Sequence, residues 1–383
     1  MIPYIIVGTV LLALVILSLK PENSHWVSAV CFVILLIFTG LRYNLGYDWL
    51  AYEKYFEYLD TSISFKNYYL SQNVLIVEYL YFLLNVFVKY IGNFELLLFL
   101  ISFFNIYIIH HMCNKIDKSS HAFVWFVYFC LALVMAQFNI LRQSIASSFV
   151  ILAILSSIDN KRKSSFVLMA AAIGFHTSTI IFIPLLFLKN LRIKAPIVIS
   201  ALFIVGVIAI SGSYLLSSFI NVIYPYLPGR ISEKAGTYVL SLSGGSGWGI
   251  SPFAVALTFV YFIVVWLLYK AEERAYTNIA IWLTIYVLVA HIAFSHAPLL
   301  WNRIMCVSLP WQMAVLWKVF VTRRLGETQR WVGLASGGAV ALAAMTYQMS
   351  RPESIAFVPY HSLLQVWLFN DEGDGRVRSM YAV

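Results

Sequence analysis

Long apolar runs separated by short polar stretches make up most of the chain. Each run is close to the length of about 20 residues that a helix needs to cross the hydrocarbon core of a bilayer. We therefore predict an all-helical, multi-pass membrane protein with roughly ten to twelve transmembrane helices. The runs occupy residues 2–19, 26–41, 74–90, 94–111, 122–138, 143–158, 165–188, 196–220, 252–269, 277–294, 303–320 and 331–345. Because no long stretch remains for an independent soluble domain, we expect one transmembrane domain over residues 1–383.

Three polar stretches interrupt this pattern. Residues 42–73 are too polar to span a bilayer and too aromatic for a disordered linker. Since Tyr and Trp favour the membrane interface, we expect there an interfacial helix or a segment folded over the membrane domain. Residues 221–250 form the longest predicted loop, and loops of this size often cover or bind a ligand. Residues 346–383 are predicted as a polar C-terminal tail.

Basic clusters give a partial topology. Lys161, Arg162 and Lys163 mark a cytoplasmic loop, which places Arg142 on the outward side if the intervening run crosses once. The basic residues within 189–194 also look cytoplasmic, although an apolar run lies between the two clusters. Either this cue misleads once, or residues 165–188 form a re-entrant segment. A re-entrant segment would carry His176 near its tip and would need its broken backbone buried in protein or lining a cavity.

Composition narrows the class of protein. Hydrophobic residues make up 61% of the chain and charged residues 11%, with a mean hydropathy of +0.82, which excludes an ordinary soluble domain. The net charge of +9 fits cytoplasmic loops, an anionic membrane surface or an anionic substrate. The four cysteines lack the spacing of a disulfide framework or a zinc site, and no Walker A, HExxH or GxSxG motif occurs. We expect no metal, no cofactor and no nucleic-acid partner.

Four arginines stand at the boundaries of apolar runs. The planar guanidinium suits bidentate binding of phosphate oxygens, so several of them converging on one cavity would bind a diphosphate. The candidates are Arg42, Arg142, Arg230 and Arg303, with Gln143 beside the second of them. The alternative for each arginine is a side chain that snorkels to the interface at a helix end and binds no ligand.

Two residues are candidates for a general base. The side chain of His176 can serve as a base or a hydrogen-bond donor near neutral pH, or it can simply bridge two helices. Asp48 can also act as a base, and its pairing with an arginine is the structural alternative. Glu78 and Glu95 stand near the starts of apolar runs, where carboxylates complement the helix dipole, so we interpret both as structural.

Aromatic residues near these arginines suggest sugar contacts. Trp301 and Asn302 precede Arg303 in a predicted polar turn, a combination that would suit sugar and phosphate recognition. Tyr43 and Tyr52 are candidates of the same kind in the first polar stretch. An ordinary interfacial anchor would have a similar composition.

The order of four short motifs resembles the EpsG-like branch of the Wzy-type polysaccharide polymerases. The matching residues are Gly40, Arg42, Tyr43, Gly46, Asp48 and Tyr52; then Asn139, Arg142, Gln143 and Ala146; then Phe175, His176, Ser178 and Pro184; and then Asn302, Arg303 and Pro310. Pro359 and Tyr360 resemble a further element near the C-terminus of that family. The match extends over most of the chain.

The resemblance implies a bacterial inner-membrane glycosyltransferase with a GT-C-like fold and an active site facing the periplasm or cell exterior. Such an enzyme joins repeat units of O-antigen, capsule or exopolysaccharide that are linked to undecaprenyl diphosphate, without a metal or a nucleotide. Donor and acceptor are both lipid-linked oligosaccharides, and membrane lipids, a Wzz-like chain-length regulator and a flippase are the further expected partners.

On this interpretation the arginines bind the diphosphate and stabilise its developing charge, while His176 or Asp48 activates the acceptor hydroxyl. Three alternatives remain open: a transporter or flippase of lipid-linked oligosaccharides, an O-antigen ligase-type transferase, and a scaffold without catalysis. Broken helices with buried cations also occur in transporters.

Overall fold

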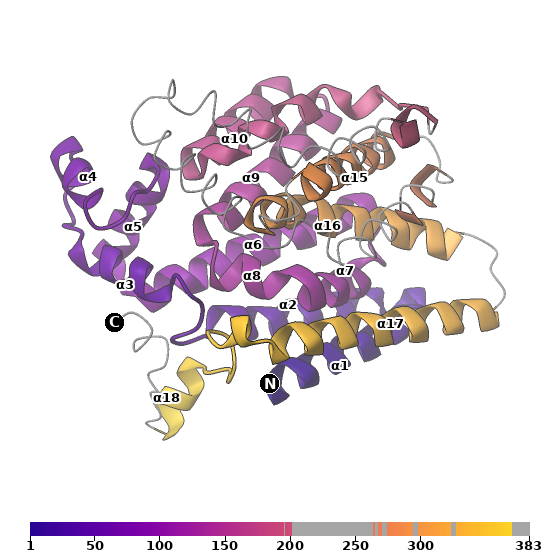
Figure 1. Ribbon diagram of the computed structural model, residues 1–383, viewed down its shortest axis with the longest axis horizontal. Helices are drawn as coiled ribbons and strands as arrows, with labels where there is room; N and C mark the ends of the chain where they lie inside the picture. Colours follow the sequence, from indigo (N-terminus) through magenta and orange to yellow (C-terminus); the bar gives the residue numbers. More distant parts are fainter. Residues whose placement is uncertain are drawn as a thin grey trace, which may run out of the picture. The chain divides into compact units, whose positions relative to one another are not determined.

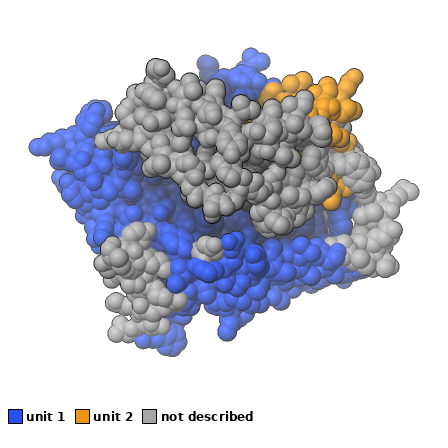
Figure 2. Space-filling view, viewed as in Figure 1, with its two compact units in different colours: residues 1–187, 309–383 blue, residues 188–308 orange. Residues whose placement is uncertain are grey.

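The computed structural model describes residues 1–194, 196–200, 263–264, 267–269, 274–293, 298–322 and 327–369. Its contacts divide the chain into two compact units, Met1–Phe187 with Leu309–Val383, and Leu188–Ser308 (Figure 2). The predicted all-helical class is confirmed for these residues (Figure 1), whose only β pairing is an isolated bridge between Arg42 and Ser362. The single domain over residues 1–383 stays a prediction. The predicted loop at residues 221–250, with Arg230, lies outside the described residues.

Three segments of the described chain are long and apolar enough to cross a membrane. They are α6 (Phe94–Ile116), the continuous run of α7, η2 and α8 (His121–Phe138), and α9 (Leu141–Ile158). Shorter apolar stretches include α1 (Ile2–Leu17), α2 (Ser24–Gly40), α5 (Tyr79–Ile91) and the part Ala275–Ala290 of α15 (Ala275–Ala293). These helices agree with a membrane protein, whereas the count of ten to twelve spans and the GT-C-like bundle stay predictions.

In the first unit α2, α6, α9 and α10 (Arg162–Phe175) pack in succession (Figure 1). A buried polar cluster fixes α9 against α6 and α8. The Asn105 amide donates to Ser144 Oγ at 2.9 Å and to Gln137 Oε1 at 3.2 Å, and Ser148 Oγ donates to Asn105 Oδ1 at 2.7 Å. Because polar side chains in an apolar bundle need partners, this cluster specifies the position of α9 and of Arg142 near its start.

The stretch predicted at residues 165–188 forms a hairpin. The 14 residues of α10 extend about 21 Å along α9, and the 10 residues of η3 (Thr177–Leu186), a 3-10 helix, extend about 20 Å back. Ser157, near the end of α9, donates to the Leu186 carbonyl at 2.6 Å, so both ends of the hairpin lie at the same end of α9. His176 lies at the turn. This hairpin has the shape expected of a re-entrant segment. Its depth in a membrane stays a prediction.

The predicted C-terminal tail is not simply a tail in the described part of the chain. Helix α17 (Glu327–Ser350) packs against α1, and the chain after it returns to the segment that follows α2. Tyr43 N donates to the His361 carbonyl at 3.1 Å, and Leu363 N donates to the Leu41 carbonyl at 2.7 Å. A short helix, α18 (Leu363–Phe369), ends the described chain.

Gly46 is a sensitive point of this returning contact. Its N–H donates to the Ala356 carbonyl at 2.9 Å, and its φ is +103°. A Cβ at this position would collide with the Phe138 carbonyl oxygen. Gly46→Ala is therefore expected to destabilise the fold by about 1–3 kcal/mol, measured as a lower thermal-unfolding midpoint in detergent. Gly337→Ala in α17 is the matched control, because a Cβ there meets no atom within 4 Å. An unchanged midpoint for Gly46→Ala would contradict the structure.

Candidate functional site

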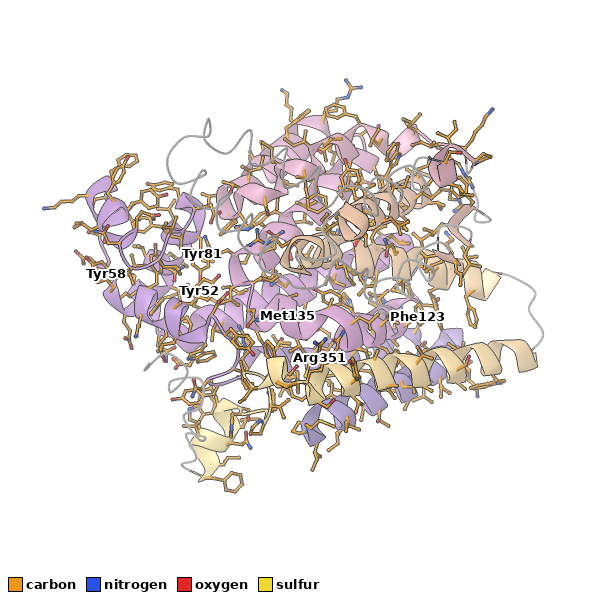
Figure 3. The ribbon with its side chains drawn as sticks, viewed as in Figure 1. Tyr52, Tyr58, Tyr81, Phe123, Met135 and Arg351 are labelled. Carbon is orange, nitrogen blue, oxygen red and sulfur yellow. The ribbon has the colours of Figure 1, made fainter. Side chains whose placement is uncertain are left out.

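The polar stretch at residues 42–73 folds over the helices of the first unit. It forms α3 (Trp49–Tyr58) and α4 (Phe65–Ser71), and α3 buries Trp49, Tyr52 and Tyr55 in a cluster with residues of α5, α6 and α9. The ring centroids of Tyr52 and of Tyr81 in α5 are 5.8 Å apart. The two residues are labelled side by side in Figure 3. This packing fits either expected alternative, so the choice between an interfacial helix and a folded-over segment stays a prediction. This packing brings the end of the stretch to the start of α9.

Arg142, the second residue of α9, is held from three sides. Its Nη1 donates to Glu78 Oε2 at 2.7 Å and to the Ile76 carbonyl at 2.9 Å, and its Nε donates to the Tyr52 hydroxyl at 3.5 Å. Only 18% of the side chain is exposed. The side chain is therefore paired inside the fold, while its role as a ligand-binding residue stays a prediction. The described hydrogen bonds of Arg142 use Nε and Nη1, and none of them uses Nη2.

Glu78 joins Arg142 to His176. The residue immediately precedes α5 without a side-chain capping bond, and its Oε1 accepts from His176 Nδ1 at 2.9 Å and from Thr177 N at 3.2 Å. Burial alone would raise the pKa of Glu78, but the hydrogen bond from His176 and the charge of Arg142 lower this pKa to about 2. The carboxylate is therefore ionised at neutral pH and can only accept. It follows that Nδ1 of His176 carries the donated proton.

A second contact joins the same two segments one residue further on. Ser178 Oγ donates to Gln143 Oε1 at 2.8 Å, and the Gln143 amide donates to Ser147 Oγ at 3.4 Å. The start of η3 is thus fixed to α9 beside the bridge through Glu78. Arg142 with Gln143 and His176 with Ser178, which are separate motifs in the sequence, form one cluster in the fold.

Arg42 occupies a different, enclosed place. Its side chain is 1% exposed, and its Nη1 donates to the Thr39 carbonyl at 2.5 Å and to Ser102 Oγ at 3.2 Å. The guanidinium carbon lies 5.2 Å from the centroid of the Phe138 ring. The remaining nitrogens, Nε and Nη2, have no hydrogen-bond partner among the described residues. Within the described contacts, Arg42 is not part of the cluster around Arg142.

The other predicted site residues are not brought into this cluster by a described contact. Asp48 precedes α3, where its charge acts on the Tyr52 hydroxyl, and the ring of Tyr43 packs edge-on against Trp49. Trp301 and Asn302 do not form the expected turn, because the backbone there is already helical in α16 (Pro298–Thr322). The side chains of Trp301 and Asn302 lie outside the described residues. Arg303, also in α16, belongs to the second unit.

The low pKa of Glu78 makes stability depend on pH. A folded-state pKa of about 2, below the ordinary 4.5, means that Glu78 stabilises the fold above about pH 4.5. This contribution, on the order of 3 kcal/mol, is lost as the pH falls towards 2. Wild type is therefore expected to unfold at a higher temperature than Glu78→Gln at pH 7, with a difference that shrinks steadily between pH 5 and pH 3. A difference independent of pH, measured in detergent, would contradict the ion pairing.

Glu78 is the member of the cluster that we interpreted as purely structural. In the sequence it looks like Glu95, since both stand at the start of an apolar run. Glu95 lies in the first turn of α6, where no described hydrogen bond or ion pair involves it. The sequence feature that pointed to such a carboxylate is Arg142, because an arginine at the boundary of an apolar run requires a counter-ion. Local sequence did not show which carboxylate supplies it.

The described helices are apolar and carry a largely buried ionic cluster at helix ends, which fits the class of membrane proteins with an internal polar site. The family model of the EpsG family matches residues 25–362. The chain belongs to the EpsG family, bacterial membrane proteins of exopolysaccharide biosynthesis. The match includes Arg42, Glu78, Arg142 and His176. A search of curated proteins and a search of solved structures gave no match.

Proposed function

We propose that this chain polymerises oligosaccharide repeat units linked to undecaprenyl diphosphate, on the outward face of the bacterial inner membrane and without a metal. The observation that carries the proposal is the cluster of Arg142, Glu78 and His176. It combines a cation with one open nitrogen, a fixed imidazole and a location at the ends of apolar helices. Family membership restricts the biological context to exopolysaccharide synthesis.

Arg142 is the proposed ligand of the donor diphosphate. Its Nη2 makes none of the described hydrogen bonds to Glu78, Ile76 and Tyr52, so a phosphate oxygen bound at Nη2 would leave those bonds in place. Negative charge grows on the diphosphate as the bond from the anomeric carbon to the leaving oxygen breaks, and a fixed cation lowers the barrier most at that stage. Gln143, Arg42, Arg230 and Arg303 are proposed as further diphosphate ligands.

His176 is the proposed general base. When its neutral ring donates from Nδ1 to Glu78, the lone pair resides on Nε2. Nε2 takes the proton of the acceptor sugar hydroxyl while the hydroxyl oxygen forms the new bond to the anomeric carbon of the donor. Undecaprenyl diphosphate leaves with the electron pair of the broken bond. Asp48 remains the alternative base, and Tyr43, Tyr52, Trp301 and Asn302 are proposed sugar contacts.

The direct test is synthesis by the purified protein. Protein in detergent is incubated with lipid-linked repeat units of the exopolysaccharide of its own source organism, and the products are separated by size. A ladder of longer lipid-linked chains is expected, with no added metal or nucleotide. If the units stay single in detergent but cross the bilayer of sealed vesicles, the protein is a transporter and the proposal is wrong. Transfer of glycan only to a different acceptor lipid would indicate a ligase.

A further inference from the structure

Glu78 bridges the two groups to which the proposed reaction assigns different tasks. Its two oxygens are divided between them, with Oε2 bonded to the guanidinium of Arg142 and Oε1 bonded to the imidazole of His176. Arg142 is 64 residues away in the sequence and His176 is 98 residues away, so this bridge exists only in the folded chain. One carboxylate therefore controls the orientation of both side chains.

We propose that Glu78 is a positioning residue that keeps Nδ1 of His176 protonated and directs Nη2 of Arg142 towards the substrate. This inference rests on the proposed function, because it concerns the base and the diphosphate ligand of that reaction. Glu78 itself touches neither the acceptor hydroxyl nor the diphosphate. It acts through the two side chains that do.

The carboxylate also suits the charge that the reaction creates. Arg142 and Glu78 together are neutral, so the cluster gains one positive charge when His176 takes the acceptor proton. Glu78 lies 2.9 Å from that ring, and the side chains of Glu78 and His176 are only 15% and 13% exposed. Electrostatic interactions are stronger in such a water-poor setting than in bulk water. Glu78 therefore stabilises the imidazolium that forms, as the aspartate of a Ser-His-Asp triad does.

A main-chain hydrogen bond and a helix N-terminus also hold the Glu78 carboxylate in place. The carboxylate also accepts from Thr177 N, where the chain leaves α10 and begins η3. The position before α5 adds the favourable field of a helix N-terminus. The side chain is thus held by a charge, a ring and a main-chain amide, and each of these contacts requires an acceptor. A glutamine has only one acceptor oxygen, so it cannot satisfy all of them.

The test compares Glu78→Gln and Glu78→Asp with Glu95→Gln, which changes the other helix-start carboxylate. We expect Glu78→Gln to lower kcat by about 100-fold or more, while KM for the lipid-linked unit changes by less than about 3-fold. The acid limb of the pH profile of kcat is expected to move to lower pH, because the imidazolium loses a neighbouring negative charge. Glu78→Asp is expected to recover part of kcat, and Glu95→Gln to match wild type. Equal pH profiles for wild type and Glu78→Gln would overturn the proposal.

A second measurement does not depend on activity. Nitrogen NMR of histidine-labelled protein reports which ring nitrogen carries the proton, and His176→Asn identifies the signal of His176. In wild type the neutral ring is expected to be protonated at Nδ1, and in Glu78→Gln this preference is expected to weaken. If wild type makes no polymer, the proposed function fails, while this NMR result still tests the positioning of His176. If wild type makes polymer but the tautomer of His176 is the same in both proteins, only the role of Glu78 fails.

Discussion

Replacing Arg142 with alanine is expected to abolish polymer formation and to leave single lipid-linked repeat units unconsumed. The substitution removes the open Nη2 that is proposed to bind the diphosphate, and loss of one such stabilising group typically costs about 10²-fold to 10³-fold in rate. It also leaves Glu78 half-buried without its cation, which disturbs the orientation of His176. The combined loss places Arg142→Ala at or beyond the upper end of that range. Chain length on a gel and the amount of remaining lipid-linked unit measure the effect.

Two further variants separate charge, geometry and folding at Arg142. Arg142→Lys keeps the positive charge but not the planar fork, so it is expected to retain the fold and only a small part of the activity. Arg162→Ala, at the exposed start of α10, removes an arginine outside the cluster and is expected to leave chain length unchanged. Normal polymer length from a correctly inserted Arg142→Ala protein would exclude Arg142 from the site.

His176→Asn is expected to reduce kcat by about 10²-fold to 10⁴-fold with little change in stability. The side-chain amide of asparagine can occupy the place of Nδ1 and donate to Glu78, but it provides no base in place of Nε2. The substitution therefore separates two roles of His176: the hydrogen bond that stabilises the turn between α10 and η3, and the transfer of a proton. Rates with lipid-linked units and thermal unfolding in detergent measure the two properties.

The matched control for this variant is His25→Asn. His25 lies exposed near the start of α2 and is no part of the cluster, so its replacement is expected to keep both rate and stability. If His176→Asn keeps the wild-type rate, His176 is not the base. Asp48→Asn then tests the remaining candidate, and the proposed mechanism changes accordingly.

The long helices could be predicted from the sequence because apolar runs specify them directly. The run at residues 143–158 became α9 (Leu141–Ile158), and the break near His176 became the turn between α10 and η3. The run at residues 74–90 was less well predicted, since α5 begins only at Tyr79. Residues 74–77 are apolar too, but they lie outside the helix. The carbonyl of Ile76 in this segment accepts a hydrogen bond from Arg142. Hydropathy does not contain such a tertiary contact.

The candidate site was predicted in part. Arg142 and His176 were identified because ionisable groups beside apolar runs are costly, and the structure joins them through one carboxylate. Glu78 could not be distinguished from Glu95 without the fold. Arg42 is enclosed among Thr39, Ser102 and Phe138. Whether Arg42 and Arg142 line the same cavity stays a prediction. A local sequence pattern does not show which distant residues come together.

The contact between residues near Arg42 and the chain around Ser362 has a consequence for biosynthesis. The backbone around Arg42 leaves the ribosome more than 300 residues before its partners from Ala356 to Leu363. Such a distant pairing cannot form while the intervening helices are still being inserted. The segment around Arg42 is therefore without these backbone partners for most of translation. This contact is therefore completed late, only when residues 356–363 have been made and have docked.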